Sequence, residues 1–368
     1  MRITFLLPRY GWTPSGGFRV VYTYANLLAE RGHDVAVIHP RRLPPGGWPR
    51  PSNLGQRLHF AAGRVRDRLL RPRVRWAEPD PRVRMHYVDA LTPDRIPDAD
   101  AVIATWWSTA EAALALPASK GVRFHLIQGY ESWNGAEERV QAVWRAPLRK
   151  IVIARWLVQR ARELGVSESM MTHVPNAINQ AVFRLQRPIE ARPPHVAMLY
   201  SGEPYKGGDL GIEVLRRARE HVPQLTATLF GVRRGPRGLP RWIEYIHRAS
   251  AQELARLFNR SAIYLCPSLT EGWHLPPAEA MACGCALVSS DIGGVRDYAI
   301  DGVTALLFPA GDSAAGTDRL VLLLRDEALR RALAVRGGAL IGDFSWQRSV
   351  ARLETFLEQS RAPAAVPG

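Results

Sequence analysis

Short apolar runs alternate with amphipathic segments from the start of the chain. Residues 3–7 form an apolar run that ends at Pro8, and residues 34–39 form a second run rich in β-branched side chains. Between them, residues 20–30 carry apolar side chains at helical spacing, and residues 11–17 have the composition of a turn-rich loop. Because repeated strand–helix–strand units build parallel sheets covered by helices, this pattern predicts an α/β fold.

The same alternation continues along the chain and restarts after a proline-rich stretch near residues 175–195. Further strands are predicted at 101–105, 123–128, 150–154, 171–174, 195–200, 225–230, 262–266 and 286–290. Further helices are predicted at 210–221, 251–259, 277–283, 318–325, 327–337 and 346–360. Two α/β domains are therefore expected, at residues 1–180 and 181–345, followed by a helix and tail at 346–368. Ligands of such domains bind at the carboxyl ends of the parallel strands.

Length and composition fit a globular protein of two domains. The chain has 368 residues, 46% of them hydrophobic, and it contains no apolar run near the length that a membrane-spanning helix needs. Its start is predicted to be a strand rather than a signal peptide.

Cys266, Cys283 and Cys285 suggest neither a disulfide framework nor a metal site, and we expect them to be small buried residues. This cysteine usage fits a cytoplasmic location. Peripheral attachment to the inner face of the plasma membrane is a second expectation that is compatible with it.

Positive charge is concentrated in the first half of the chain. The formal net charge is +15, and residues 1–175 hold 26 basic residues against 15 acidic ones. Such a field favours an anionic partner, whether nucleic acid, acidic lipid headgroups or a phosphorylated substrate. Residues 57–76 are predicted to contain a basic amphipathic helix. It is either a solvated surface helix, an element that binds a membrane surface or an acceptor, or a nucleic-acid contact.

The densest cluster of chemically active residues lies at 267–284, directly after the apolar run that ends at Cys266. Glu271 is predicted to lie in the loop. Glu279, eight residues later, is predicted in the first turn of a helix that starts at two adjacent prolines. A helix N-terminus can receive phosphate oxygens, and a carboxylate can accept both hydroxyls of a ribose. The pattern therefore predicts a site for phosphate and ribose.

This string resembles the E-x7-E signature of retaining glycosyltransferases of family 4. The GT-B fold of that family has two Rossmann-like domains whose parallel sheets face an interdomain cleft. Other similar segments are residues 289–297, 301–308 and 174–179, and the N-terminal glycine loop formed by Ser15, Gly16 and Gly17 with Arg19. The resemblance is strong over the C-terminal half and weak over the first half. It implies that the last helix crosses back to the first domain. No metal or other cofactor is expected to be required if cations of the chain suffice to hold the diphosphate.

The resemblance assigns roles to residues of the second domain. Glu279 would bind the nucleotide ribose, Glu271 the hydroxyls of the donor sugar, and Lys206 the diphosphate. The backbone that would line the sugar and phosphates belongs to Gly272, Trp273, His274 and Leu275. Lys206 is also one of only three lysines in an arginine-rich chain, and a lysine in a glycine-rich loop suits a phosphate as a point charge.

In the first domain, the resemblance places Gly16 and Gly17 on the loop after the first strand, where backbone amides can approach a phosphate or an acceptor. Residues expected on the acceptor side are Gln128, Tyr130 and Arg19. Gln128 stands where the family often has a histidine. This replacement resembles the pattern of rhamnosyltransferase-like members of the family. Glu131 is the candidate general base.

Two departures from the family concern the donor site. The arginine that usually precedes the phosphate lysine by five residues is replaced by Ser201, so Arg233 or Arg234 is expected to supply the second cation. The usual Phe-Gly of the signature is Trp273-His274, which changes the sugar pocket and leaves the donor sugar open. The chain also has no G-x-G-x-x-G string, which disfavours chemistry with NAD.

The implied reaction transfers a hexosyl group from a nucleotide-diphospho-sugar to a hydroxyl of a glycan or lipid-linked acceptor, with retention at the anomeric carbon. Lys206, a second cation and helix-end amides would stabilise negative charge on the departing diphosphate. The basic first half suits an anionic acceptor, as in the synthesis of cell-envelope polysaccharide or glycoconjugate. Two alternatives remain: a non-enzymatic basic protein that binds nucleic acid, and another GT-B enzyme such as a nucleotide-sugar epimerase or a phosphorylase.

Overall fold

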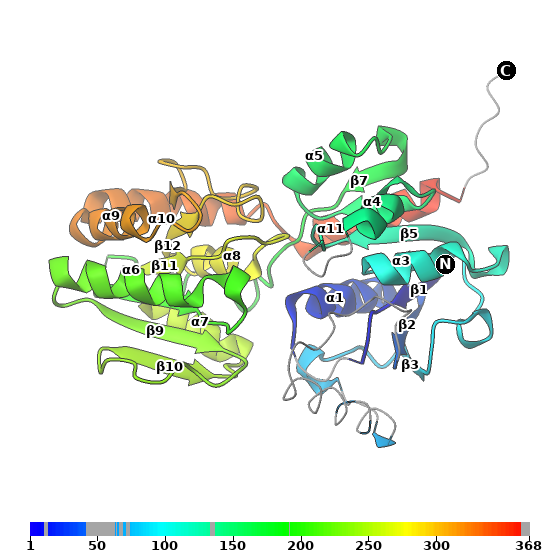
Figure 1. Cartoon of the computed structure of the whole chain (residues 1–368), viewed down its shortest axis with the longest axis horizontal. Coiled ribbons are helices and arrows are strands. Elements are labelled where there is room, and N and C mark those ends of the chain that lie inside the picture. The colour runs from blue at the N-terminus through cyan, green and yellow to red at the C-terminus, as the bar shows by residue number, and fades with distance from the viewer. Residues whose placement is uncertain are drawn as a thin grey trace. The chain divides into compact units, whose positions relative to one another are not determined.

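In a computed structural model, the chain forms two compact units, each built around a parallel sheet (Figure 1). The structure describes residues 1–10, 14–41, 63, 65, 69–70, 74–132, 137–190 and 192–361. The first unit comprises Met1–Ile153, Leu157–Pro175 and Gln347–Gly368. The second comprises Ala154–Trp156 and Asn176–Trp346. The break therefore falls after Pro175 instead of residue 180, and the last helix is grouped with the first unit.

The first unit contains a seven-stranded parallel sheet in the order β3-β2-β1-β4-β5-β6-β7. Its strands are β1 (Arg2–Leu6), β2 (Asp34–Pro40), β3 (Arg84–Val88), β4 (Ala101–Ala104), β5 (Val122–Ile127), β6 (Arg149–Val152) and β7 (Met171–His173). The helices that belong wholly or mostly to it are α1 (Gly16–Glu30), α3 (Trp107–Leu114), α4 (Glu137–Arg145), α5 (Arg155–Glu163) and α11 (Trp346–Gln359). The central strands are apolar on both faces because helices cover both, which is why their sequences are continuous apolar runs.

Helix α1 begins earlier than its sequence pattern predicts. Ser15 has an extended backbone, and its side chain accepts a hydrogen bond from the backbone N of Phe18 at 3.4 Å, so it caps the helix. Gly16 and Gly17 are therefore the first two residues of α1, and the prediction that they lie on a loop is wrong. They still present their backbone N–H groups at the carboxyl end of β1, since the first residues of a helix lack internal partners for these groups.

The second unit contains a six-stranded parallel sheet in the order β10-β9-β8-β11-β12-β13. Its strands are β8 (His195–Leu199), β9 (Thr226–Gly231), β10 (Ile243–His247), β11 (Ile263–Cys266), β12 (Ala286–Ser290) and β13 (Ala305–Phe308). Its helices are α6 (Gly208–His221), α7 (Ala251–Arg260), α8 (Leu275–Ala282), α9 (Ser313–Arg325) and α10 (Glu327–Ile341). Because α8 begins at Leu275, Glu279 is its fifth residue and lies beyond the first turn, contrary to the prediction.

Three other expectations meet the structure at this point. The three cysteines are free and buried, as predicted. Across the described residues, no helix combines the length and the apolar character that crossing a membrane requires. Most of the predicted basic helix at 57–76 lies outside the described residues, so its role stays a prediction.

Candidate functional site

Lys206 and Glu271 meet at the carboxyl ends of two adjacent strands. Lys206 follows β8 in the short 3-10 turn Pro204–Lys206, and Glu271 follows β11. Since β8 and β11 pair in register, the two loops start side by side. The Lys206 Nζ lies 2.7 Å from each carboxylate oxygen of Glu271, and the Ser268 hydroxyl donates to Oε1 of Glu271 at 3.0 Å. The structure therefore brings together the two residues to which the sequence assigned the phosphate and the sugar.

Glycines allow these loops to approach each other. Gly207 has φ +61°, and a Cβ built on it would lie 2.0 Å from the backbone oxygen of Pro267, which is in the loop after β11. Likewise, a Cβ on Gly294 would lie 2.5 Å from the Cβ of Glu271. Neither position can take a larger residue without moving a loop of the site, because both contacts are far shorter than real Cβ contacts.

His274 is the third residue in contact with the Glu271 carboxylate. Its side chain is buried, its Nε2 lies 3.3 Å from Oε1 of Glu271, and its Nδ1 lies 3.2 Å from Sγ of Cys266. Its backbone is fixed as well, since its N donates to the Gly294 carbonyl at 3.0 Å and its carbonyl accepts from the Tyr298 hydroxyl at 2.6 Å. The imidazole is therefore held between a thiol and a carboxylate.

Burial and charge set the protonation states of this cluster. Burial raises the pKa of Glu271, but nearby His274 and Lys206 and the hydrogen bonds from Lys206 and Ser268 outweigh it, so the pKa lies below its ordinary value. Burial lowers the pKa of His274 to about 4; the Glu271 carboxylate opposes this shift, and Lys206 adds to it. Burial raises the pKa of the Cys266 thiol to about 11. At neutral pH the site thus holds a carboxylate, a neutral imidazole and a protonated thiol.

The other residues of the predicted sugar and phosphate loop are mostly buried. The Gly272 carbonyl accepts from the indole Nε1 of Trp156 at 2.7 Å. Trp273 is only 5% exposed and packs edge-on against Tyr298, with ring centroids 5.0 Å apart. Leu275 and Glu279 are buried on α8, and Glu279 is 5% exposed. Buried side chains therefore hold the loop in one conformation, as a site that must orient its ligand requires.

The two candidate second cations lie on the loop after β9. Arg233 is exposed, and one of its guanidinium nitrogens lies 2.9 Å from the carboxylate of Glu203, in the loop that carries Lys206. Arg234 is also exposed and follows directly in the chain. Arg233 therefore reaches the predicted phosphate loop through Glu203. For Arg234 the structure gives no contact of that kind.

In the first unit, the predicted acceptor-side residues fall into two groups. The Gln128 amide lies against the start of α1, since a Cβ on Gly17 would lie 3.4 Å from its Nε2. Arg19 lies in the first turn of the same helix, where its backbone N donates to Ser15. Tyr130 is farther along and donates from its hydroxyl to Glu137 at 2.6 Å, beneath the Arg160 guanidinium.

Glu131 has a different environment from the one expected of a general base. It is buried, and its Oε2 accepts from the backbone N of Trp107 at 3.2 Å, at the start of α3. Burial raises its pKa well above the ordinary value, although this hydrogen bond opposes the shift. An acid that holds its proton is a poor proton acceptor, so the geometry connects Glu131 with the start of α3 more directly than with catalysis.

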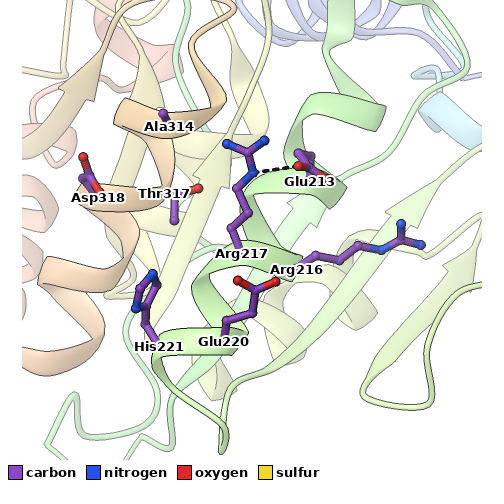
Figure 2. A pocket seen from close by; sticks show the side chains of 8 residues that line it. All are labelled: Glu213, Arg216, Arg217, Glu220, His221, Ala314, Thr317 and Asp318. Atoms are coloured by element: carbon purple, nitrogen blue, oxygen red, sulfur yellow. Dashed lines mark hydrogen bonds and ion pairs between the residues drawn. The ribbon is translucent and has the colours of Figure 1, made fainter.

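A surface hollow of about 460 Å³ lies elsewhere in the second unit, between α6 and α9 (Figure 2). Its lining mixes both signs of charge, and Figure 2 shows Arg217 paired with Glu213, with 2.6 Å between Nε and Oε1. The α6 residues of the hollow follow the first turn of that helix, so they lie away from the end that adjoins Lys206. None of the predicted site residues lines the hollow.

An Asp-x-Asp tripeptide, the pattern that often binds a metal in glycosyl transfer, occurs at Asp98 and Asp100. It precedes β4, at the amino end of the sheet, away from the carboxyl ends where ligands bind. Its carboxylates are engaged, since Asp98 pairs with Lys120 at 2.8 Å and Asp100 accepts from the backbone N of Arg2 at 2.7 Å. The two carboxylates therefore bond to residues at the amino ends of β1 and β5, the strands on either side of β4.

A known protein family resembles the region that holds Lys206 and Glu271. Residues 180–339 match the family model described as glycosyl transferases group 1. The match lies within the second unit, which is therefore similar to the glycosyl transferases of group 1. This match includes both loops of the site, from the turn at Lys206 to the helix that carries Glu279.

Two curated relatives resemble parts of the chain. Phosphatidyl-myo-inositol mannosyltransferase of Mycobacterium leprae is 29% identical over 151 residues, or 39% of this chain and 40% of that protein. D-inositol 3-phosphate glycosyltransferase of Frankia alni is 28% identical over 185 residues, or 45% of each. The matched regions span less than half the length of these relatives.

A solved structure resembles the whole chain. Anabaena Alr3699/HepE in complex with UDP-glucose has a TM-score of 0.70 and 16% identity, and the likeness covers 98% of this chain and 99% of that one. At this identity the likeness is one of fold. The predicted GT-B fold, with two Rossmann-like α/β domains, is confirmed.

Sequence reasoning missed the residues that support the site. Ser268 stands three residues before Glu271 in the same loop, and this short spacing could have indicated the contact. Gly294 lies in the segment 289–297 that resembles the family, but the resemblance does not indicate its close approach to Glu271. Trp156 carries no signal, because it comes from another part of the chain and reaches the site loop through the backbone carbonyl of Gly272. The contact between Cys266 and His274 needs the loop after β11 to fold back on its own strand, which spacing alone does not predict.

Proposed function

We propose that the chain is a retaining glycosyltransferase that moves a hexosyl group from a nucleotide-diphospho-sugar to a hydroxyl of a glycan or lipid-linked acceptor. The observation that carries the proposal is the direct contact of Lys206 with Glu271 at the carboxyl ends of adjacent strands in a region similar to the group 1 glycosyl transferases. A cation for the diphosphate and a carboxylate for the sugar hydroxyls are the two groups that such a donor needs.

In this proposal, each group acts at a defined part of the donor. Lys206, aided by Arg233, stabilises the negative charge that builds on the diphosphate as the bond to the sugar breaks. Glu271 accepts hydrogen bonds from sugar hydroxyls, and Glu279 accepts from the nucleotide ribose. Because Glu271 is ionised and buried, its hydrogen bonds with hydroxyls are strong and fix the orientation of the sugar. Retention at the anomeric carbon is part of the proposal.

The relatives support the choice of donor and acceptor classes. The structural neighbour from Anabaena was solved with UDP-glucose, and the two curated relatives are named for inositol-containing acceptors. Both named acceptors carry phosphate, which agrees with the positive charge of residues 1–175. We therefore propose an anionic acceptor, lipid-linked or phosphorylated, and synthesis of cell-envelope glycoconjugates as the process.

The proposal is tested by donor hydrolysis and transfer with a panel of UDP-, GDP- and dTDP-hexoses. Mass spectrometry of phosphorylated and lipid-linked polyols offered as acceptors would reveal the product, and NMR would give its anomeric configuration. We expect turnover with one donor class and retained configuration in the product. Glu271→Ala should lower turnover by about a hundredfold or more, because the donor sugar is no longer held in place. An inverted product would refute retention. Binding of duplex DNA without any affinity for a nucleotide-sugar would refute glycosyl transfer as a whole.

A further inference from the structure

The carboxylate of Glu271 has more partners than its proposed work with a sugar requires. Lys206, Ser268 and His274 all lie within 3.3 Å of its oxygens. A diphosphate that binds Lys206 competes for the same ammonium hydrogens, because a lysine has only three. Donor binding therefore weakens the hold of Lys206 on Glu271 at the moment when Glu271 must be well oriented.

His274 is placed to take over that hold. Its Nε2 faces Oε1 of Glu271 at 3.3 Å, and this buried nitrogen has no hydrogen-bond partner among the residues that the structure describes. The ring cannot swing away, because the backbone on both sides of it is hydrogen-bonded and the side chain is 4% exposed. A small shift of the carboxylate away from Lys206 would complete the hydrogen bond.

Cys266 decides which ring nitrogen carries the proton. A neutral imidazole has one N–H, and the partner of the other nitrogen determines where it is. The protonated Cys266 thiol lies 3.2 Å from Nδ1 and can donate to it, which would place the ring proton on Nε2, facing the carboxylate. Without the thiol, Nδ1 can carry the proton, and Nε2 would then turn a lone pair toward Glu271 and repel it.

We propose that Cys266 and His274 form a positioning relay, in which the thiol fixes the imidazole tautomer and the imidazole holds Glu271 in place for the donor sugar once the diphosphate has engaged Lys206. This rests on the proposed function. The relay belongs to this chain's own departure from the family signature, since His274 stands where the family has glycine. It acts on the sugar half of the donor and leaves the nucleoside diphosphate half unaffected.

Two kinds of measurement separate the relay from a merely structural role. The first compares the donor KM with the Kd of the matching nucleoside diphosphate. In His274→Gly we expect the donor KM to rise about 10- to 100-fold, the range of a hydrogen bond to a charged group, with the nucleoside diphosphate Kd changed less than about twofold. His274→Gln, which keeps an N–H donor, should recover part of this loss. An equal change of KM and Kd in both variants would overturn the proposal.

The second measurement tests the thiol without any ligand. The 15N chemical shifts of histidine in the full chain report the tautomer of His274, identified by its loss in His274→Gln. We expect the Nε2–H form in the wild type and in Cys266→Ser, and a mixed or Nδ1–H form in Cys266→Ala. Cys285→Ala is the matched control, because Cys285 is equally buried but donates to the backbone carbonyl of Phe258. An unchanged tautomer in Cys266→Ala would overturn the relay.

The two measurements also separate this inference from the proposed function. If the wild-type chain binds no nucleoside diphosphate and no nucleotide-sugar, the proposed function fails, and with it the role of the relay in donor binding. If the wild type binds the donor but the His274 variants match it in KM, the proposed function stands and only the relay fails. Thermal unfolding of each variant checks that the fold is kept.

Discussion

Gly207→Ala is predicted to damage both the stability of the second unit and its donor site. At φ +61°, any residue with a Cβ carries a conformational cost of about 1–2 kcal/mol. The added Cβ would also lie 2.0 Å from the backbone oxygen of Pro267, so the two loops must separate. Forcing atoms into a packed region costs about 1–3 kcal/mol more. The total loss of unfolding free energy is therefore about 2–5 kcal/mol.

The matched control is Gly238→Ala in the same unit. Gly238 also has a left-handed backbone, at φ +72°, but a Cβ there would have no atom within 4 Å. It should cost only the conformational part, about 1–2 kcal/mol. The two variants are compared by thermal unfolding, by urea unfolding and by their KM for the donor. We expect a lower melting temperature and a higher donor KM in Gly207→Ala than in Gly238→Ala. Equal stability and equal KM in the two variants would refute the argument that loop contact at Gly207 builds the site.

Three further predictions concern Lys150, Arg192 and the independence of the reaction from a metal. Burial lowers the pKa of Lys150 to about 8, so the unfolded chain binds more protons than the folded one between pH 8 and about 10.4. In urea unfolding across that pH window, the free energy of unfolding of the wild type should rise by about 3 kcal/mol relative to that of Lys150→Met. The same pH dependence in both proteins would contradict this. Buried Arg192 donates to four backbone carbonyls, three of them at the carboxyl ends of α7 and α8. Arg192→Met should lower the free energy of unfolding by at least about 3 kcal/mol, whereas the exposed Arg237→Met should change it very little. Transfer should continue in excess EDTA, because Lys206 and Arg233 supply the cations for the diphosphate; loss of turnover that Mg²⁺ or Mn²⁺ restores would refute this.

The sequence pattern predicts buried central strands better than sheet edges. β1, β2, β8 and β12 are continuous apolar runs because helices cover both of their faces. The pattern missed β3, which lies at a sheet edge and consists of Arg84 and four half-buried residues. It missed β10 for the same reason, since β10 is one edge strand of the other sheet and only Ile243 is buried in it. The pattern also missed β13, the opposite edge strand of that sheet, although β13 is apolar and mostly buried, so weak burial explains only β3 and β10.

The candidate site was predictable in its residues but not in its contacts. Glu271 and Lys206 stand out by their places in two loops, yet their contact depends on the pairing of β8 with β11, which a linear pattern does not specify. The start of α8 was misplaced because a proline is tolerated within the first helical turn, so Leu275 and not a proline begins it. Glu131 was selected by its place after β5, and only the structure revealed its burial at the start of α3.

Calorimetric titration of nucleotide-sugars into the wild-type chain, Lys206→Met and Lys120→Met tests the central claim most directly. Both lysines are bonded to a carboxylate, Lys206 to Glu271 and Lys120 to Asp98, each at 2.7–2.8 Å, so the two variants make the same chemical change. The account predicts that one donor binds the wild type and Lys120→Met alike and that Lys206→Met weakens binding at least tenfold. Equal binding to all three proteins would contradict a diphosphate site at Lys206.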